Sequence, residues 1–557
     1  MKKFTRLTAV LFFIAGNCIA QFNPVWYAQF QHTTTPGYSN EGRRIAEDGS
    51  GNIFMLSDAT SDIDAGGLTG TTTHHYVTLT KYSSTGTLLL SKFIEVGSHI
   101  ISGYNNLNAL GLEIDAAGNI YIGYSIYFAN TDLDVTIEKY NNNLSRIWGN
   151  TYQQNGVDVL VDFKLNAGGT VYAVMKSVNG PNTTYSVIKS IPSIGFALLV
   201  TSWSPNTAII NSIALDGAQS AYVGGSVPRG GYKNAYVAKI NLTSNTITWT
   251  SSYIPKGING DNVVNKIVVG VDGNIYSTGT SYQGPSKGDQ VLVLSNLPGN
   301  AKFNYILLLG NSIGSDKGLF ITATEPGWLY IASTSQNDVV VYRFQSSGAG
   351  PAPAMSVLTP IPHSSYTAVT SISLSAMKTT PVKNVYVTGT ITATGPSGGF
   401  SCAFLEKFSV AFGNALIHSS SAGVEGDFNN NYQAVDISLD AAKTDVYWLR
   451  NNWTSAHANE FVELSDLDVP SPLRESVKFN TAGNIFVVPN PASGRTTFQS
   501  EENIMNIEIM DVSGNIVLKI PSASRQVSVD ISSLTAGIYI CKVSTENGEQ
   551  VKRLVVN

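Results

Sequence analysis

The chain has 557 residues and a formal net charge of −5, and charged residues make up only 13% of it. This acidic balance argues against nucleic-acid binding, and no run of Lys or Arg indicates binding to lipid headgroups. Aromatic residues reach 10% and there are 51 glycines. Together with the low charge, this composition favours an all-β protein rich in turns.

The N-terminus has the pattern of an export signal. Lys2, Lys3 and Arg6 precede the apolar run LTAVLFFIAG, which is too short for a membrane helix of about 20 residues. Small residues follow it and favour cleavage between Ala20 and Gln21. We therefore expect residues 1–20 to be a signal peptide, with a buried core helix as the alternative. No later segment is apolar enough over a sufficient length to span a membrane.

A Gly-Asn-Ile-aromatic motif recurs along the chain. It reads DGSGNIFMLSD from Asp48, DAAGNIYIGYS from Asp115 and GVDGNIYSTGT from Gly270. The aromatic positions that align are Phe54, Tyr121, Tyr172, Tyr222, Tyr276, Tyr330, Tyr386 and Tyr447. Their regular spacing, near 50 residues, is typical of solenoids and propellers.

Each repeat carries the same series of strands. An apolar alternation such as NALGLEID leads through a tight turn to a second strand such as IYIGYS, and a third and a fourth strand follow, such as VTIEKY and SRIWGNTY. These segments are short, have a period of two and show no helical period between them. Four antiparallel strands in each repeat form one blade of a β-propeller.

The two ends of the repeat region complement each other. The eighth repeat runs from EFVELSDL directly into DVPSPLRES without a fourth strand, while NPVWYAQF at the mature N-terminus resembles a fourth strand with no repeat before it. Pairing the two would close the ring and remove an open β edge. The sequence therefore predicts an all-β, eight-bladed β-propeller over residues 21–469, with seven blades as the runner-up.

The recurring turn has a structural explanation. We expect its Asp to cap the turn, its Gly to supply a positive φ and the aromatic that follows to pack between blades. Calcium binding by Asp48, Asp115, Asp216 and Asp272 is the alternative, but each turn offers only one or two carboxylates. The motif resembles the bacterial β-propeller repeat D-x-x-G-N-x-Y-V-x-G over about residues 40–460. That resemblance implies the fold and not the function.

Two further sets of residues recur or stand alone in the repeat region. A basic residue occurs near the end of the third strand at Lys81, Lys139, Lys189, Lys239, Arg343 and Lys407. We expect these side chains to be solvated at strand ends. Cys402 and Cys541 remain after signal cleavage. We expect them to lie in different domains as small core residues, with neither a disulfide nor a metal site.

The composition changes at Pro470 and Pro472, which mark a linker over residues 470–483. Residues 484–557 then predict about seven short strands in a small β-sandwich. Within them PNP, DVSGNIV, SLTAGIYICKV and a terminal KRLVV follow one another. This order resembles the type A C-terminal sorting domain of proteins exported by the type IX secretion system. An ordinary adhesion-like sandwich is the alternative.

The resemblance implies both a route and a set of signal residues. Such a domain engages the type IX machinery, takes the protein across the outer membrane and is commonly removed. The implied location is secreted or on the outer cell surface, by way of the periplasm. The implied signal residues are Pro489, Asn490, Pro491, Gly514, Gly537, Tyr539 and Lys552. From the residues alone, we expect Gly537 to permit a close approach or a bend and Tyr539 to begin a buried strand.

The sequence assigns no catalytic residue, metal ligand or cofactor. The variable segments between the second and third strands are the expected binding loops, and their aromatics are Tyr124, Tyr127, Phe128, Tyr232, Tyr282 and Trp453. These rings would stack on sugars or grip a protein. The leading hypothesis is a non-catalytic protein- or glycan-binding module. A secreted carbohydrate hydrolase or lyase and a structural surface component are the alternatives.

Overall fold

The computed structural model describes residues 24–30, 39–63, 69–97, 111–129, 132–152, 156–191, 196–204, 206–217, 219–256, 258–310, 314–335, 338–346, 354–358, 368–381, 383–395, 398–410, 416–424, 430–440, 442, 446–454, 458–465, 485–488, 490, 492–511, 515–545 and 548–556. The expected signal peptide with its cleavage site at Ala20 and Gln21, and the expected linker, lie outside these ranges. In the described ranges the regular structure is β-strand, and no helix there could span a membrane. The chain forms two compact units, Met1–Pro470 and Ser471–Asn557.

The strands of the first unit follow one another in a regular series. They are β1 (Pro24–Phe30), β2 (Ser39–Glu47), β3 (Ile53–Ile63), β4 (Thr69–Tyr82), β5 (Leu88–Gly97), β6 (Gly111–Ile114), β7 (Ile120–Ala129), β8 (Asp132–Tyr140), β9 (Arg146–Tyr152), β10 (Val157–Leu165), β11 (Val171–Asn179), β12 (Asn182–Ile191), β13 (Phe196–Ser202), β14 (Ile209–Leu215), β15 (Ser220–Arg229), β16 (Tyr232–Asn241), β17 (Thr246–Tyr253), β18 (Asn262–Val269), β19 (Ile275–Tyr282), β20 (Gly288–Asn296), β21 (Phe303–Leu309), β22 (Gly314–Glu325), β23 (Trp328–Ser335), β24 (Asp338–Gln345), β25 (Ala354–Leu358), β26 (Ala368–Thr379), β27 (Asn384–Gly395), β28 (Gly398–Val410), β29 (Leu416–Val424), β30 (Asn430–Leu439), β31 (Val446–Thr454) and β32 (Ala458–Ser465).

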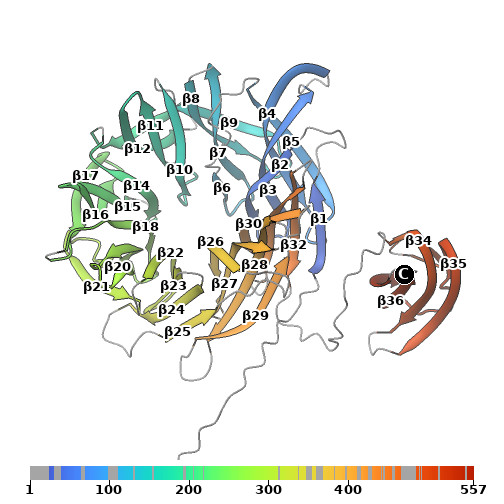
Figure 1. Cartoon of the computed structure of the whole chain (residues 1–557). Helices are drawn as coiled ribbons and strands as arrows, with labels where there is room; N and C mark the ends of the chain where they lie inside the picture. The colour runs from blue at the N-terminus through green and yellow to red at the C-terminus, as the bar shows by residue number, and fades with distance from the viewer. Residues whose placement is uncertain are drawn as a thin grey trace, which may run out of the picture. The chain divides into compact units, whose positions relative to one another are not determined.

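From β2 onward, each run of four consecutive strands pairs antiparallel in chain order, and we call such a run a quartet. Two sheets hold two quartets each, because a third strand also pairs in parallel with the first strand of the next quartet, as at Leu133 and Val157. The first strands lie at the centre of a ring, and each contacts the next around the circuit from β2 through β30 and back to β2 (Figure 1). This is the all-β, propeller-like fold that the sequence predicts. Eight blades remain our interpretation, in which each quartet is one blade.

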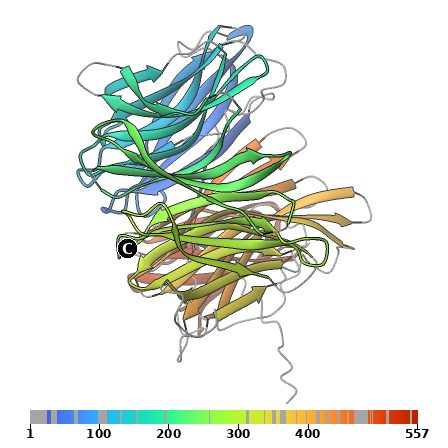
Figure 2. The same ribbon diagram turned by 90° about the vertical axis from the view of Figure 1, so that its left-hand side faces the viewer.

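The last quartet is completed from the other end of the chain. Strand β1 pairs antiparallel with β32, and Trp26 stands opposite Leu464 and Gln29 opposite Phe461. The predicted pairing of the mature N-terminal strand with the eighth repeat is therefore confirmed. Seen from the side, the sheets of this unit stand next to one another with their strands inclined (Figure 2).

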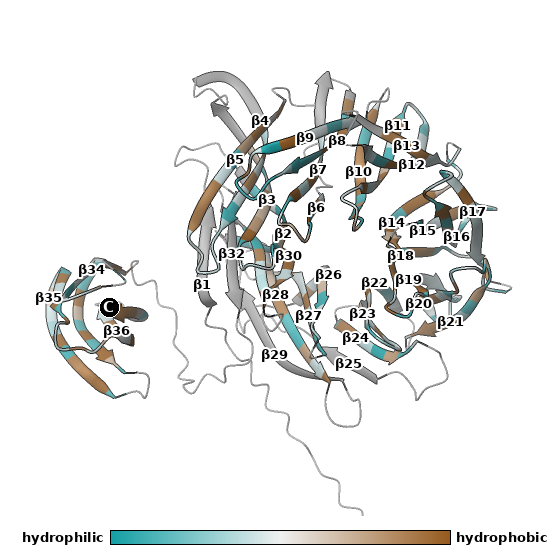
Figure 3. Ribbon diagram, turned by 180° about the vertical axis from the view of Figure 1, so that it is seen from behind, coloured by the Kyte–Doolittle hydropathy of each residue, from teal (hydrophilic) through white to brown (hydrophobic). Residues whose placement is uncertain are grey.

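Buried side chains fill the spaces between neighbouring quartets. Tyr121 packs with Val135 on its own quartet and with Leu160 and Phe163 on the next, and Tyr222 packs with Val264 on the following quartet in the same way. Hydrophobic and hydrophilic segments alternate along the strands (Figure 3), as expected for sheets packed face to face. The expected position of the repeated aromatic between blades is confirmed.

The second unit is a small β structure with its own core. Its described strands are β33 (Phe486–Val488), β34 (Arg495–Met510), β35 (Ile516–Asp530), β36 (Gly537–Thr545) and β37 (Gly548–Val556). Strand β34 pairs with β35 along most of its length and, in its two halves, with β33 and then with β36. Within the described part of this unit, the strands are fewer and longer than the expected seven, because register shifts near Ile504 rather than turns join the two halves of β34. Residues from both halves of β34 belong to one buried hydrophobic cluster.

Candidate functional site

The repeated turn is held by its aspartate, as the sequence predicts. Asp115 accepts hydrogen bonds from the backbone N–H groups of Ala117 (3.0 Å) and Asn119 (2.8 Å), and Gly118 has φ 77°. The hydroxyl of Tyr121 donates to the same carboxylate at 3.1 Å. Asp48 and Asp216 likewise accept from the N–H four residues further on, whereas Asp272 stands two positions later in its turn and accepts from the N–H of Asn274. These contacts hold each carboxylate within its own turn.

The repeated basic residue is partnered with the repeated aromatic. Lys139 stands directly opposite Tyr121 across β7 and β8, with its Nζ 4.7 Å from the ring centroid. The same pairing joins Lys81 to Phe54, Lys239 to Tyr222, Arg343 to Tyr330 and Lys407 to Tyr386. The expectation that these cations are solvated at strand ends is wrong for three of the six, and Lys139, Lys189 and Lys239 are partly exposed. Lys81, Arg343 and Lys407 are buried, because the ring face and polar groups nearby replace water around them.

Several of these cations also reach the following quartet. Lys239 donates from Nζ to the carbonyl of Pro298 at 3.0 Å, Lys189 to Oδ1 of Asn245 at 3.3 Å and Lys81 to the carbonyl of Asn142 at 3.2 Å. The acceptors lie in turns between third and fourth strands. The basic residues therefore join neighbouring quartets, and they do not form a ring of free positive charge.

A β-bulge interrupts most of the first strands at the same place. Register shifts occur between Leu160 and Asp162 in β10, between Ile210 and Ser212 in β14 and between Val264 and Lys266 in β18. The extra residue then bonds to the next first strand: Asn211 donates from Nδ2 to the carbonyl of Val264 at 2.8 Å. Asn265 and Ser375 make the same contact with Gly318 and Ala434. A bulge re-aims side chains and frees backbone groups, and here both serve the contact between quartets.

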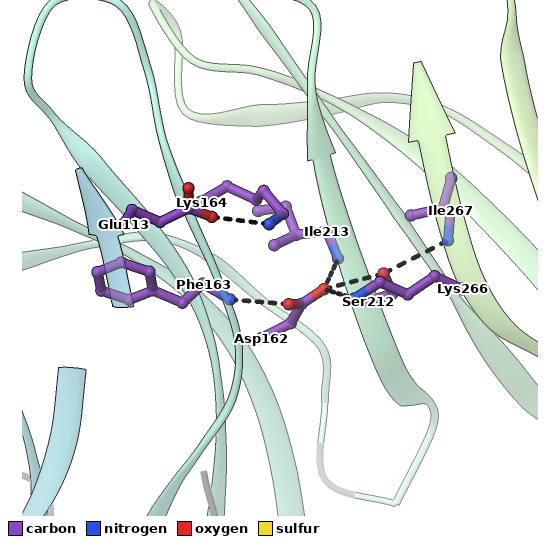
Figure 4. A network of polar contacts seen from close by, with 8 residues as sticks. All are labelled: Glu113, Asp162, Phe163, Lys164, Ser212, Ile213, Lys266 and Ile267. Carbon is purple, nitrogen blue, oxygen red and sulfur yellow. Dashed lines mark hydrogen bonds and ion pairs between the residues drawn. The ribbon is translucent and has the colours of Figure 1, made fainter. Parts of the chain in front are cut away.

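The residue after the bulge builds a charged network across four first strands (Figure 4). Asp162 on β10 accepts from Ser212 Oγ and the backbone N–H of Ile213, both at 2.9 Å, and from Lys266 Nζ on β18 at 3.0 Å. Lys164, two residues further along β10, pairs with Glu113 on β6 at 2.8 Å. Acidic and basic side chains are therefore clustered on the inner strands of the ring.

The electrostatics of this network suit a structural role. Burial opposes ionisation of Asp162, but Lys266 and Lys164 outweigh it and lower its pKa to about 2. Burial likewise disfavours the charged form of Lys164, yet Glu113 and Asp162 hold its pKa above the usual range. Both groups are thus firmly charged at neutral pH. A general acid or base works best with a pKa near the working pH, so neither is tuned for proton transfer.

The structure separates the six aromatics expected on binding loops. Tyr124 is only 2% exposed and lies within β7, so its assignment to a surface loop is wrong. Its strand continues to Ala129 and leaves only a short connection to β8. Tyr127 and Phe128 on β7 and Trp453 on β31 also lie within strands, and their side chains are outside the described part. Among the three aromatics with described side chains, Tyr232 and Tyr282 reach the surface.

Tyr232 is presented by a tight hairpin. Gly230 and Gly231 connect β15 to β16 with φ 53° and 89°, which is the geometry of a two-residue turn that favours glycine. Tyr232 stands opposite Arg229 in this hairpin and is 44% exposed. The turn therefore holds an aromatic ring and a guanidinium next to each other at the surface.

Asp261, at the start of the next quartet, connects Lys233, the chain neighbour of Tyr232, to the backbone of Tyr282. It accepts from the backbone N–H of Lys233 at 3.0 Å and pairs with its Nζ at 3.5 Å, and its own carbonyl accepts from the N–H of Tyr282 at 3.2 Å. The ring of Tyr282 packs so closely over Gly260 that a Cβ there would lie 2.1 Å from it. We call Arg229, Tyr232, Lys233, Asp261 and Tyr282 the tyrosine platform.

Buried polar side chains form hydrogen bonds with the backbone of the platform and with one another. Asn262, 2% exposed, donates to the carbonyls of Gly260 (3.0 Å) and Lys233 (3.4 Å), and accepts from Ser281 at 2.5 Å. Gln283 donates to Ser281 in turn. Such a fixed support keeps surface side chains in place before a ligand arrives.

In the second unit, the predicted signal residues meet the last strand. Oδ1 of Asn490 accepts from the N–H of Val555 at 2.8 Å. Tyr539 is 7% exposed and donates to the carbonyl of Thr535 at 2.9 Å, which confirms its buried position. Lys552 stands opposite Cys541, and burial lowers its pKa. Pro489, Pro491 and Gly514 lie outside the described residues.

The close approach expected at Gly537 is not observed, and the burial expected for the two cysteines is confirmed. A Cβ on Gly537 would meet nothing closer than the carbonyl of Thr535 at 3.9 Å, an ordinary contact, so its packing does not require glycine. Cys402 and Cys541 are free and buried in separate units, as expected. Burial raises the pKa of Cys541 to about 12.

Comparison with known families decides what this second unit is. Residues 486–557 match the secretion system C-terminal sorting domain. The chain carries a type IX sorting domain. The sorting domain marks proteins that type IX secretion exports to the cell surface or the extracellular space. The chain is therefore an exported protein that interacts with the type IX machinery.

Solved structures similar to the chain share little sequence with it. Sqt1 from Chaetomium thermophilum, solved with the N-terminus of ribosomal protein L10, is 9% identical over 80% of this chain and 99% of its own, with TM-score 0.42. The periplasmic gluconolactonase PpgL of Pseudomonas aeruginosa is 9% identical over 79% and 100%, with TM-score 0.39. The polysaccharide lyase Uly1 is 11% identical over 66% and 91%, with TM-score 0.40. No curated protein matches the sequence. Similarity this weak carries no inference about a ligand.

Sequence reasoning missed the residues that join the quartets. Asp162 and Lys266 lie in first strands, and Asp261 lies just before one. The one available signal was the polar residue that interrupts an apolar strand, as in NSIAL and NKIVV. The sequence did not show which strand each of these residues would meet.

Proposed function

We propose that the exported protein is a non-catalytic binding module, and that its propeller holds a glycan through the tyrosine platform. The observation that carries this proposal is that Asp261 accepts from the backbone N–H groups of Lys233, the chain neighbour of Tyr232, and of Tyr282. Segments of two neighbouring quartets that each carry a predicted binding aromatic are thereby held together.

The chemistry of the platform suits a sugar. A tyrosine ring offers a flat apolar face and a polar hydroxyl at a small cost in side-chain entropy. Arg229 and Lys233 add donors, and the side chain of Asp261, 53% exposed, adds an acceptor. Apolar rings with a few well-placed polar groups are what fix a ligand's orientation. A folded protein partner would use the same groups and is the alternative ligand.

Catalysis is the weaker proposal for the charged groups on the inner strands. A hydrolase or lyase needs a group that gains and loses a proton near neutral pH. Asp162 and Lys164 are held in their charged forms by the partners that join the quartets. We therefore propose that this network stabilises the ring and that the platform binds the ligand.

The test is binding by the mature full-length protein. Glycan-array screening identifies a ligand, and calorimetry then compares wild type with Tyr232→Ala. We expect the variant to bind at least about tenfold more weakly, since an exposed tyrosine at a contact is often worth about 1.4 kcal/mol or more. Ile306→Ala is the control, because Ile306 has the same 44% exposure on β21.

The outcomes separate the alternatives. Unchanged binding by Tyr232→Ala contradicts the platform. If the chain binds a protein and no glycan, the proposed ligand changes to a protein and the proposed binding site stays the same. Hydrolysis or elimination of a bound polysaccharide by the wild-type protein contradicts the non-catalytic reading.

A further inference from the structure

The outer face of the sorting domain carries an unusual strip of exposed hydrophobic side chains. Ile516 is 53% exposed, Ile538 50%, Val517 40% and Ile540 39%. Single exposed hydrophobic residues need no explanation, whereas a contiguous group of them marks an interaction site.

The strand register places these residues side by side. Met510 in the middle of the sheet pairs with Ile516 on β35 and with Ile540 on β36, so the three form one row across three strands. Val517 is the extra residue of the register shift beside Ile516. Ile538 lies two residues before Ile540, on the same face of the sheet. We call Met510, Ile516, Val517, Ile538 and Ile540 the outer strip.

Packing within the domain does not explain the outer strip. On β36, Tyr539, Cys541 and Val543 point inward and are 7%, 0% and 0% exposed. Ile538 and Ile540 alternate with them and point away from that core. A strand that is apolar on both faces is typical of a sheet covered on both sides. Among the described residues, only the inward face has its cover within the domain.

The strip is continuous with the signal residues of the sorting domain. Ile538 pairs with Val555, and the N–H of Val555 is bound by Asn490 of the Pro-Asn-Pro segment. The next row across the sheet is charged: Lys519 pairs with Glu508, and Glu508 stands opposite Lys542. An apolar centre with a charged border is the usual composition of a protein–protein interface.

We propose that the outer strip is the surface through which the sorting domain docks onto a protein of the type IX secretion machinery. The domain's interaction with that machinery is already established for the chain, and the strip is the apolar surface that adjoins its signal residues. The partner's matching surface is apolar, with a charged rim that complements Lys519, Glu508 and Lys542.

The experiment measures export of the full-length protein from its own cell. Ile538→Ser with Ile540→Ser should reduce the extracellular amount at least about tenfold and leave the protein in the periplasm. Leu88→Ser with Leu89→Ser is the control, because these propeller residues are 50% and 46% exposed and lie outside the sorting domain. The control should be exported normally. Circular dichroism and thermal melting of the purified variants should match wild type, since outward side chains contribute little to the core.

A photo-crosslinking residue at position 540 identifies the partner independently of folding. We expect a covalent adduct with a known component of the secretion machinery, and none from the same residue at position 88. Normal export of the Ile538 and Ile540 variant, or an adduct only with a second copy of the chain or with lipid, would overturn the proposal. Deletion of residues 486–557 separates the two claims, because it should block export whichever surface docks.

Discussion

The side chain of Asn451 holds both backbone groups of Gly42, although 409 residues separate them. The N–H of Gly42 donates to Oδ1 at 2.8 Å, and Nδ2 donates to the carbonyl of Gly42 at 3.3 Å. Asn451 is 1% exposed. The contact joins β31 of the last quartet to β2 of the first, so it lies where the ring closes.

Asn451→Ala should therefore destabilise the ring. The substitution leaves the N–H and the carbonyl of Gly42 without these partners, and each buried unsatisfied group costs about 1–3 kcal/mol. We expect the free energy of unfolding of the purified protein to fall by about 2–4 kcal/mol in urea titrations. Asn182→Ala, at an exposed hairpin, should change it by less than about 0.5 kcal/mol. Equal effects of the two variants would contradict a closing role.

Asp162→Ala tests the charged network on the inner strands. Lys266 and the N–H of Ile213 lose their shared acceptor. The side chain of Lys266 is 32% exposed, and a hydrogen bond to a charged group is worth about 1.5–3 kcal/mol. Because the folded pKa is about 2 and the ordinary value is 3.8, Asp162 stabilises the protein above pH 4. That contribution is lost as the pH falls towards 2. We expect urea titrations to show a large loss for the variant at pH 7 and a smaller one near pH 2; the same loss at both would contradict this electrostatic role.

Asp58 should make the free energy of unfolding depend on pH with the opposite sign. Burial raises its pKa to about 7, although Arg43 donates to it at 2.7 Å and opposes the shift. Between about pH 4 and 7 the folded carboxyl keeps a proton that the unfolded chain has released, so stability falls as the pH rises through this window. Asp58→Asn should flatten that part of the stability profile. An unaltered slope in Asp58→Asn would contradict the assignment.

Replacing a cation that lies over an aromatic ring should destabilise the protein more when that cation is more deeply buried. Arg343 is fully buried, with its guanidinium carbon 3.5 Å from the ring centroid of Trp328, whereas the side chain of Lys139 is 19% exposed. Cation–π contacts are worth about 0.5–1 kcal/mol when exposed and about 2 when desolvated. Thermal melting should show a larger loss for Arg343→Met than for Lys139→Met. The reverse order would contradict a stabilising role of the buried stack.

The repeated turn could be predicted from sequence because it depends on a local pattern. The ring closure could be predicted because it depends on the number of strands in each repeat. Asp115, Gly118 and Tyr121 recur at fixed spacing, and a repeat lacking a fourth strand requires a strand from elsewhere. The partners of Lys139 and Asp162 could not be found in this way. They depend on cross-strand register and on the bulges, which place side chains from different quartets in contact. Tyr124 was misplaced because the end of a strand is not visible when its apolar alternation continues into the connection.

The fold depends on β1 joining β32, and a disulfide measures that pairing most directly. Ala28 and Val462 are register partners, and neighbouring strands bring Cα atoms close enough for a disulfide. The natural Cys402 and Cys541 are buried and free. We predict that Ala28→Cys with Val462→Cys forms the bond on mild oxidation of the folded protein, detected by mass spectrometry, and that Ala28→Cys with Ala458→Cys does not. No bond in the first variant, or an equal yield in the second, would contradict a ring closed by the strand Pro24–Phe30.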